Sequence, residues 1–257
     1  MSTLNTHSQT TSTSALHRAE HLFTGPIAEE YAMLQLICPA AAEMSRQVGE
    51  RVATWPESAD GSLQLLEVGC GTGITTLNLL ARTDLALTAV DNATTMLKQA
   101  RRNLAEPIRQ QRLQLVEDDA LSFLQRQPDH SYDGVASAYT LHNFLDPYRH
   151  SVLKEILRVL KPGGQFVNGD RYGLDDTLAH LASIQDEARH YFRTFTAIGR
   201  TDLLEHWIIH LFSDESPDHV MRLAPALDAM QTLGFVGVDV LFRDGVNALV
   251  TGSKPWQ

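Results

Sequence analysis

A glycine-rich loop follows the first long apolar run of the chain and ends where a helical pattern begins. The stretch "LLEVGCGTGITT" covers residues 65–76 and has Gly69, Gly71 and Gly73 at every second position. Glycine lets a backbone turn tightly and come close to a ligand, because no Cβ stands between them. A loop of this kind between a strand and a helix is therefore a candidate for binding a small ligand through its main chain.

The spacing of the glycines helps to decide which class of ligand the loop would bind. The dinucleotide fingerprint is G-x-G-x-x-G, whereas this loop reads G-x-G-x-G, and the Gly-Lys-Ser/Thr of a phosphate-binding P-loop does not occur. Glu67 precedes the loop, where a negative charge would not help to bind a pyrophosphate. Asp91 ends the next apolar run, where a carboxylate can accept hydrogen bonds from a ribose diol. These residues favour a ligand with a cation and a ribose.

The elements that must position these residues alternate between strand and helix. The pattern predicts a helix at 93–106 that Pro107 ends, and a helix at 146–160 that "KPGG" stops. Strands that alternate with helices predict a parallel sheet with helices on both faces, with ligands bound beyond the carboxyl ends of the strands. The predicted strands are residues 63–69, 85–91, 113–120, 132–139 and 165–170.

The alternation breaks at Tyr172. Two helices with an aromatic stripe are predicted at 174–195 and 200–212, then a helix closed by Gly234. Two strands joined by "RDGV" follow, and Asp-Gly is a strong hairpin signal. The predicted fold is α/β and Rossmann-like: a seven-stranded, mostly parallel sheet with a C-terminal antiparallel hairpin, helices on both faces, and a helical lid formed by N-terminal and inserted segments.

The same patterns divide the chain into five segments. The N-terminus is polar, rich in Ser and Thr, and has no apolar h-region of a signal peptide. We expect a disordered tail at 1–16, an N-terminal helical cap at 17–60, a cofactor-binding Rossmann-like core at 61–171, a helical lid insertion at 172–215, and a final helix and β-hairpin at 216–257.

Composition limits the class of protein. Hydrophobic residues make up 43% and charged residues 20%, as in ordinary globular proteins, and the formal net charge of -10 disfavours a polyanionic partner. The apolar runs are too short to span a bilayer. Cys38 and Cys70 do not indicate a disulfide framework, which predicts a reducing, cytoplasmic location. We expect a small-molecule substrate and no nucleic-acid or membrane partner. A homodimer is one possible assembly.

Five motifs occur in order between residues 63 and 170: "EVGCGTG", "AVDNA", "VEDDAL", "YDGVASAYTLHN" and "LKPGGQFVNGD". Together they resemble the successive motifs of class I S-adenosylmethionine-dependent methyltransferases. The resemblance implies that S-adenosyl-L-methionine is the cofactor and that Gly69, Gly71 and Gly73 wrap its methionine part. It implies that Asp91 holds the ribose hydroxyls and that Glu67 orders the loop indirectly. The other residues implied at the cofactor are Asn92, Met96, Asp118, Asp119, Ala120, Ser137, Ala138 and Tyr31.

The resemblance leaves one cofactor contact open. Either Asp118 or Asp119 can meet the adenine amino group, and we favour Asp119 because it adjoins Ala120. A surface role for Asp118 is the alternative.

The acceptor site must come from the "YTLHNF" loop, the N-terminal helices and the lid. His142 follows the fourth predicted strand, where it could take a proton from an acceptor, or else pack against the sheet edge. Asp170 is the second candidate base. The remaining candidates around the acceptor are Tyr31, Tyr139, Asn143, Arg171, Tyr172, His190 and Tyr191.

Two further patterns on the lid have competing explanations. Aromatic side chains around the acceptor site can stabilise a sulfonium cation. Alternatively, the aromatic stripe on the inserted helices is simply the core side of those helices. The aromatic residues are Tyr31, Tyr139, Tyr172, Tyr191, Phe192, Phe195 and Trp207. His206 and His210 are four residues apart on one predicted helix, but no third ligand is evident in the sequence, so we predict no metal site.

Three functions remain open at this point. The first is methyl transfer to a small molecule. The second is a reaction of S-adenosylmethionine without methyl transfer: the lid followed by "LGFVGVDVLFRDGVNALVTGSK" resembles the carboxy-S-adenosylmethionine synthase branch, and azetidine-2-carboxylate synthases use the same fold. In the latter the cofactor's own amine attacks its Cγ and releases methylthioadenosine. The third is a non-catalytic cofactor-binding protein.

Overall fold

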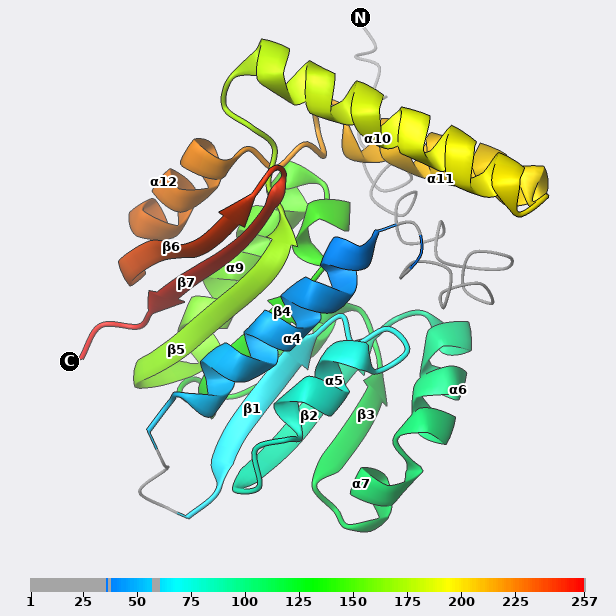
Figure 1. The fold of residues 1–257 in the computed structure, drawn as a ribbon. Coiled ribbons are helices and arrows are strands. Elements are labelled where there is room, and N and C mark those ends of the chain that lie inside the picture. The colour runs from blue at the N-terminus through cyan, green and yellow to red at the C-terminus, as the bar shows by residue number, and fades with distance from the viewer. Residues whose placement is uncertain (1–35, 37, 57–60, 257) are drawn as a thin grey trace, which may run out of the picture.

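The fold, given by a computed structural model, is built around a single twisted sheet (Figure 1). The structure describes residues 36, 38–56 and 61–256. The seven strands lie in the order β3-β2-β1-β4-β5-β7-β6. The strands are β1 (Leu63–Val68), β2 (Leu85–Asp91), β3 (Leu113–Glu117), β4 (Tyr132–Ala138), β5 (Leu160–Arg171), β6 (Val236–Asp244) and β7 (Asn247–Ser253).

The directions of the strands confirm the predicted fold class. β1 pairs in parallel with β2 and β4, and β3 and β5 extend the sheet in parallel on either side. β7 runs antiparallel to both β5 and β6. Gly245 takes a φ of 55° at the turn between β6 and β7, which is why the Asp-Gly signal located the hairpin.

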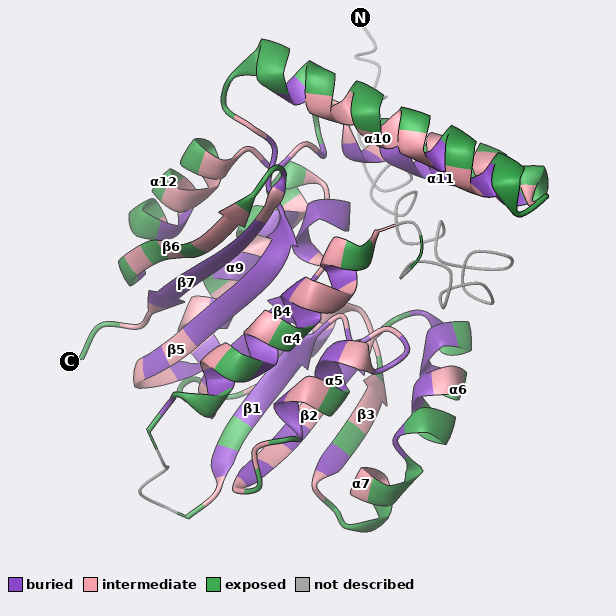
Figure 2. Ribbon diagram, viewed as in Figure 1, coloured by how far each residue is buried: buried purple, intermediate pink, exposed green. Residues whose placement is uncertain are grey.

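Helices cover both faces of the sheet, because successive strand residues point to opposite sides. Leu65 packs with α4 and α5 on one face, whereas its neighbour Leu66 packs with α8, α9 and α12 on the other. Figure 2 shows the central strands mostly buried between these layers. The helices are α4 (Pro39–Ala53), α5 (Ile74–Leu79), α6 (Thr94–Asn103), α7 (Ala105–Arg109), α8 (Ala120–Arg126), α9 (Asp146–Val159) and α12 (Leu223–Leu233).

The lid is a helical hairpin with its own apolar core. α10 (Thr177–Ala197) and α11 (Thr201–Asp214) lie side by side beyond the ends of β5 and β7 (Figure 1). Tyr191, Phe195 and Trp207 pack with Leu203 and Leu211 between the two helices. The aromatic stripe is therefore mainly the core of the lid, and Phe192 faces solvent with 54% of its surface exposed.

Two local predictions differ from the structure, and one helix was not predicted. Pro107 does not end the predicted helix: α6 ends at Asn103, and Pro107 lies in the first turn of the short helix α7, where its missing N–H costs no hydrogen bond. α8, the crossover between β3 and β4, was not predicted. The helix predicted at 146–160 is confirmed by α9, which ends at Val159, but "KPGG" belongs to β5, which begins at Leu160 and not at the predicted residue 165. The pairing of β5 with β4 shifts register between Tyr132 and Gly134.

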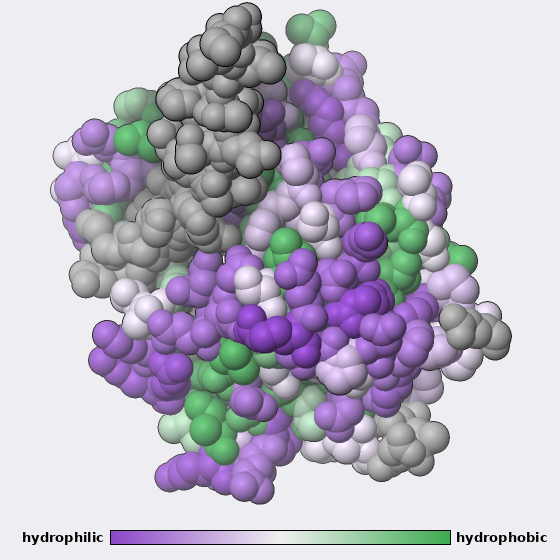
Figure 3. All heavy atoms as spheres, turned by 180° about the vertical axis from the view of Figure 1, so that it is seen from behind, coloured by the Kyte–Doolittle hydropathy of each residue, from purple (hydrophilic) through white to green (hydrophobic). Residues whose placement is uncertain are grey.

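No helix among the described residues is long and apolar enough to cross a membrane. The face shown in Figure 3 is largely hydrophilic, with apolar residues in separate small groups. The predicted tail at 1–16 and most of the predicted cap lie outside the described residues, and so does Tyr31.

Candidate cofactor and acceptor site

The glycine loop takes a backbone path that only glycine follows easily. Gly69 has a φ of +76°, and a Cβ added there would lie 2.1 Å from the Oγ1 of Thr140. Gly71 has a φ of +53°, and its Cβ would enter open space beside a cavity. Gly69 is therefore needed for packing against the end of β4, while Gly71 leaves room for a ligand to approach the main chain.

Asp91 fixes the loop from the end of β2. Its Oδ2 accepts a hydrogen bond of 2.8 Å from the Gly71 amide, and its Oδ1 accepts one of 2.8 Å from the Ala93 amide. A carboxylate has about four acceptor positions, so each oxygen can still accept from a hydroxyl. This geometry fits the predicted ribose role, and it adds a second role in holding the loop that the sequence did not indicate.

Glu67 is buried behind the loop and does not line the cavity. The hydroxyl of Thr76 on α5 donates to Glu67 Oε2 at 2.6 Å, which ties the end of β1 to α5 across the loop. Burial raises the pKa of Glu67 to about 8, so the carboxyl group is mostly protonated at neutral pH. This arrangement agrees with the predicted indirect role in ordering the loop.

A cavity opens at the carboxyl ends of β1, β2 and β4, where the topology predicts ligand binding. Eight of the residues predicted for the cofactor line it: Gly69, Gly71, Asp91, Asn92, Met96, Asp118, Ala120 and Ala138. Ile74, Thr75, Tyr139, Thr140, Asn143 and Phe144 are also in its wall. Gly73 and Ser137 are not among the residues that line the cavity. A Cβ at Gly73 would lie 2.5 Å from the side chain of Leu104. The Ser137 hydroxyl donates to the Val68 carbonyl at 3.0 Å.

The two aspartates after β3 have different surroundings. Asp118 lines the cavity and forms an ion pair with Arg126. Asp119 caps α8, where its Oδ1 accepts from the Ser122 amide at 2.8 Å and its Oδ2 accepts from the Tyr148 hydroxyl. Asp118 thus lies on the wall of the cavity, whereas Asp119, which the sequence analysis favours for the adenine contact, is bound as the helix cap.

Tyr139 and Asn143 bring polar atoms to the cavity from the turn after β4. Tyr139 has a φ of 49°, which is uncommon for a residue with a side chain, and its hydroxyl donates to Asn247 Oδ1. Burial raises the pKa of the Tyr139 phenol above its usual value, so it stays protonated at neutral pH. Asn143 Nδ2 donates to the Tyr139 carbonyl at 3.2 Å, while Asn143 Oδ1 is buried with no partner among the described residues.

His142 and Asp170 do not line the cavity. They bind each other: His142 Nδ1 lies 2.5 Å from Asp170 Oδ1. Asp170 also accepts from the amides of Leu141 at 2.9 Å and Arg171 at 2.8 Å. Burial opposes the charged form of the His142 imidazole, but the Asp170 carboxylate outweighs this effect, so the pKa of His142 is raised. Burial opposes the charged form of Asp170 as well, but His142 and the hydrogen-bond donors around it lower the pKa of Asp170. Neither residue is placed to take a proton inside the cavity.

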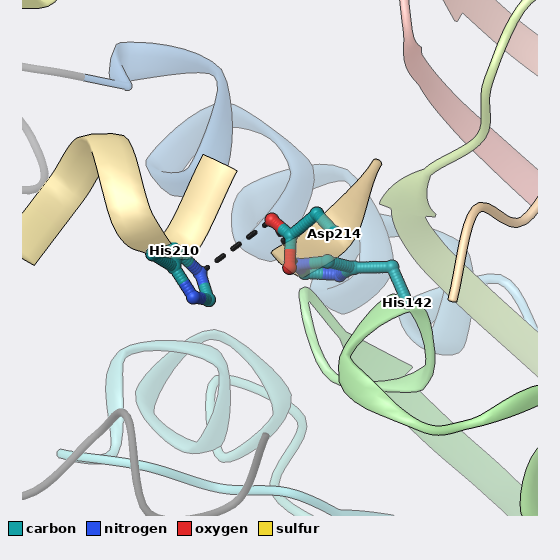
Figure 4. A group of neighbouring side chains, drawn as sticks. All are labelled: His142, His210 and Asp214. Carbon is teal, nitrogen blue, oxygen red and sulfur yellow. Dashed lines mark ion pairs between the residues drawn. The ribbon is translucent and has the colours of Figure 1, made fainter. Parts of the chain in front are cut away.

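The other side of His142 faces the lid. Its Nε2 lies 3.9 Å from Asp214 Oδ2 at the end of α11, and His210 Nε2 lies 3.6 Å from the same oxygen (Figure 4). His206, which the sequence pairs with His210, is exposed. The relevant partner is Asp214, four residues after His210, and that i, i+4 spacing was available in the sequence.

The remaining acceptor candidates belong to the lid contact or to the core. Arg171 binds Glu187 and Glu215, and Tyr191 donates to Glu187 at 2.5 Å. Tyr172 is fully buried at the sheet, where its hydroxyl accepts from Asn168 Nδ2 at 2.9 Å. The sequence did not single out Thr140, whose hydroxyl donates to the Gly69 carbonyl at 3.1 Å.

The core of the chain is similar to known methyltransferases. Residues 65–164 match the family model described as a methyltransferase domain. Sterol 24-C-methyltransferase of Aspergillus fumigatus is 35% identical over 106 residues, which are 40% of this chain and 26% of that protein. The chain spans about a quarter to two fifths of the length of the curated relatives that it matches.

Solved structures share the fold over most of the chain. An O-methyltransferase family protein from Burkholderia thailandensis is similar with a TM-score of 0.62 and 16% identity, covering 90% of this chain and 60% of that one. Phosphoethanolamine N-methyltransferase 2 of Haemonchus contortus, solved with S-adenosylhomocysteine, has a TM-score of 0.57 and 14% identity, covering 82% of this chain and 52% of that one.

The family match ends at residue 164, before the lid, and neither of these relatives is a synthase of the kind that the lid resembles. Residues 65–164 match a methyltransferase domain, and the seven-stranded sheet that contains them has the fold of solved methyltransferases.

Proposed function

We propose that the protein transfers a methyl group from S-adenosylmethionine to a small-molecule acceptor. The observation that carries the proposal is the cavity formed by the glycine loop, Asp91 and the turn after β4. The space beside Gly71 and the unused acceptor positions of Asp91 suit a ligand that brings a main-chain-binding part and a ribose. When bound, S-adenosylmethionine supplies an electrophilic methyl carbon.

Asn143 is the residue that we assign to the acceptor. Its Oδ1 is an unpartnered, buried hydrogen-bond acceptor in a residue of the cavity wall, and its Nδ2 is held by the Tyr139 carbonyl, which fixes the orientation of the amide. An unpaired buried polar atom costs about 1–3 kcal/mol, which a donor group on the acceptor would recover. The proposed acceptor therefore carries an N–H or O–H group.

The proposed mechanism depends on positioning and on exclusion of water. The acceptor lone pair must lie in line with the bond from sulfur to methyl, and Asn143 and Tyr139 orient the acceptor for this. The Tyr139 phenol keeps its proton, and the His142–Asp170 pair lies outside the cavity, so neither supplies a base there. The acceptor proton leaves to solvent after transfer, and walls such as Ile74 and Phe144 limit the access of water.

Mass spectrometry tests the reaction class directly. The full chain is incubated with S-adenosylmethionine alone and then with amines, phenols and other small acceptors. The proposal predicts an unchanged cofactor without acceptor, and S-adenosylhomocysteine together with a methylated product when the right acceptor is added. Methylthioadenosine formed without acceptor would refute methyl transfer and would favour intramolecular cyclisation. Asp91→Asn, which keeps the shape of the side chain, serves as the binding-deficient control.

A further inference from the structure

We propose that His142, His210 and Asp214 bind a divalent transition-metal ion between the lid and the sheet. One ligand atom of each residue lies within 4.8 Å of the others, and all three residues are buried. His142 comes from the 3-10 turn η3 (Leu141–Asn143), and the other two from the last turns of α11. Figure 4 shows the Asp214 carboxylate lying between the two imidazole rings.

The separations of the ligand atoms are close to those around an ion. Ligands about 2.1 Å from a tetrahedral zinc ion lie about 3.4 Å from one another. Asp214 Oδ2 lies 3.6 Å from His210 Nε2 and 3.9 Å from His142 Nε2. The two histidine ligand atoms lie within 4.8 Å of each other, so the three side chains would have to draw together to complete a coordination shell.

Asp170 holds His142 in the orientation that a metal ligand needs. An ionised carboxylate only accepts hydrogen bonds, so His142 Nδ1 carries the proton in the 2.5 Å contact with Asp170, and Nε2 is directed to Asp214. Histidine ligands commonly donate their other ring N–H to a carboxylate in this way. Asp170 is itself fixed by the amides of Leu141 and Arg171, which makes it a positioning residue.

The charges around the three residues favour a bound cation. Asp170 and Asp214 are both buried here, and the guanidinium of Arg171 is already bound to Glu187 and Glu215. Buried carboxylates need a compensating positive charge, because burial removes the stabilisation that water gives to an anion. A dication would supply it; a protonated histidine is the competing explanation.

The ligand set also indicates the kind of metal. Two imidazoles and one carboxylate suit zinc or iron(II), and three protein ligands leave coordination positions for water or another ligand. His142 belongs to the turn that also carries Asn143 into the cavity, so a bound ion would fix both α11 and this turn. The inference does not depend on the reaction proposed above.

Metal content tests the site without any measurement of activity. The untagged full chain is stripped with a chelator, equilibrated with Zn²⁺, freed of unbound ion and analysed by mass spectrometry for metals. We expect one zinc per chain, and at least tenfold weaker zinc binding for Asp214→Asn and for His210→Gln. His206→Ala is the matched control, because His206 is an exposed histidine on the same helix, and it should bind zinc as the wild type does.

Two more readouts keep a folding defect from being mistaken for a lost ligand. Circular dichroism of each variant checks that the fold is intact, and Co²⁺ absorption in the visible range reports coordination in the wild type. Asp170→Asn should weaken zinc binding ten- to a hundredfold, as expected for a residue that orients a ligand. If wild type and Asp214→Asn bind the same amount of zinc, or if the wild type binds none, the proposed site is refuted.

Discussion

The guanidinium of Arg171, the last residue of β5, lies 2.8 Å from Glu187 Oε2 on α10. A second carboxylate, that of Glu215 after α11, lies 3.0 Å from the same guanidinium. All three side chains expose less than a fifth of their surface, since their exposed fractions are 10%, 19% and 16%. Arg171 therefore joins the middle of α10 and the residue after α11 to the carboxyl end of β5 through one buried cation.

Replacing Arg171 should destabilise the lid contact strongly. Arg171→Met leaves Glu187 and Glu215 without their cation in a poorly solvated place, and we expect a loss of about 2–4 kcal/mol in the free energy of unfolding. Urea unfolding followed by circular dichroism measures it. Arg189→Met is the control, because Arg189 forms an exposed ion pair with Asp186 and should lose less than about 0.5 kcal/mol. Equal losses in both variants would show that the buried pairs do not matter.

Glu67 should make stability depend on pH. Its pKa is about 8 in the folded protein against 4.5 ordinarily, so between these values the folded state holds a proton that the unfolded state has lost. Its contribution to the free energy of unfolding therefore falls as pH rises, by up to about 1.4 kcal/mol per pH unit, until pH passes about 8.

Glu67→Gln removes this titration while keeping the shape of the side chain. The variant should gain stability relative to the wild type between pH 5.5 and 7.5, by about 2–3 kcal/mol in urea unfolding. Glu106→Gln, an exposed substitution on α7, should show no such change with pH. A constant difference between Glu67→Gln and wild type over this range would mean that Glu67 is ionised throughout.

Asp91 should be the strongest single determinant of cofactor affinity. Asp91→Asn removes the negative charge and one strong acceptor position, so we expect at least tenfold weaker binding of S-adenosylmethionine by calorimetry, or about 1.4 kcal/mol. Glu117→Gln is the matched control, since Glu117 ends the neighbouring strand β3 and stays 44% exposed. Unchanged affinity in Asp91→Asn would remove Asp91 from the ribose role.

Asn143 should affect the acceptor and not the cofactor. Asn143→Ala removes the unpartnered Oδ1, so kcat/KM for the acceptor should fall at least tenfold while the affinity for S-adenosylmethionine stays within twofold. Asn143→Asp keeps an acceptor oxygen but loses the Nδ2 donor to the Tyr139 carbonyl, so it should recover only part of the loss. Equal defects in the two variants would point to a structural role for the amide.

The sequence alone predicted the core of the fold and most of the residues that form the glycine-loop side of the cavity. Alternating strand and helix patterns from Leu63 onward predicted the sheet, because burial of strand faces and helix stripes leaves a regular apolar period. Gly69, Gly71 and Asp91 could be found because they lie directly at the ends of predicted strands. The crossover helix α8 was missed because its seven residues are too few to show a helical period.

Tertiary structure decided which side chains face the cavity and which face the lid. His142 and Asn143 are neighbours, yet one turns to Asp170 and the lid while the other lines the cavity. Asp118 and Asp119 divide in the same way between the wall and the cap of α8. In such turns the backbone angles decide where each side chain points, and the hydrophobic pattern of the sequence does not predict these angles. Tyr139, with its positive φ, is an example. The lid cluster joins His142 to Asp214 across 72 positions of the chain, and only the packing of α11 onto the sheet brings them together.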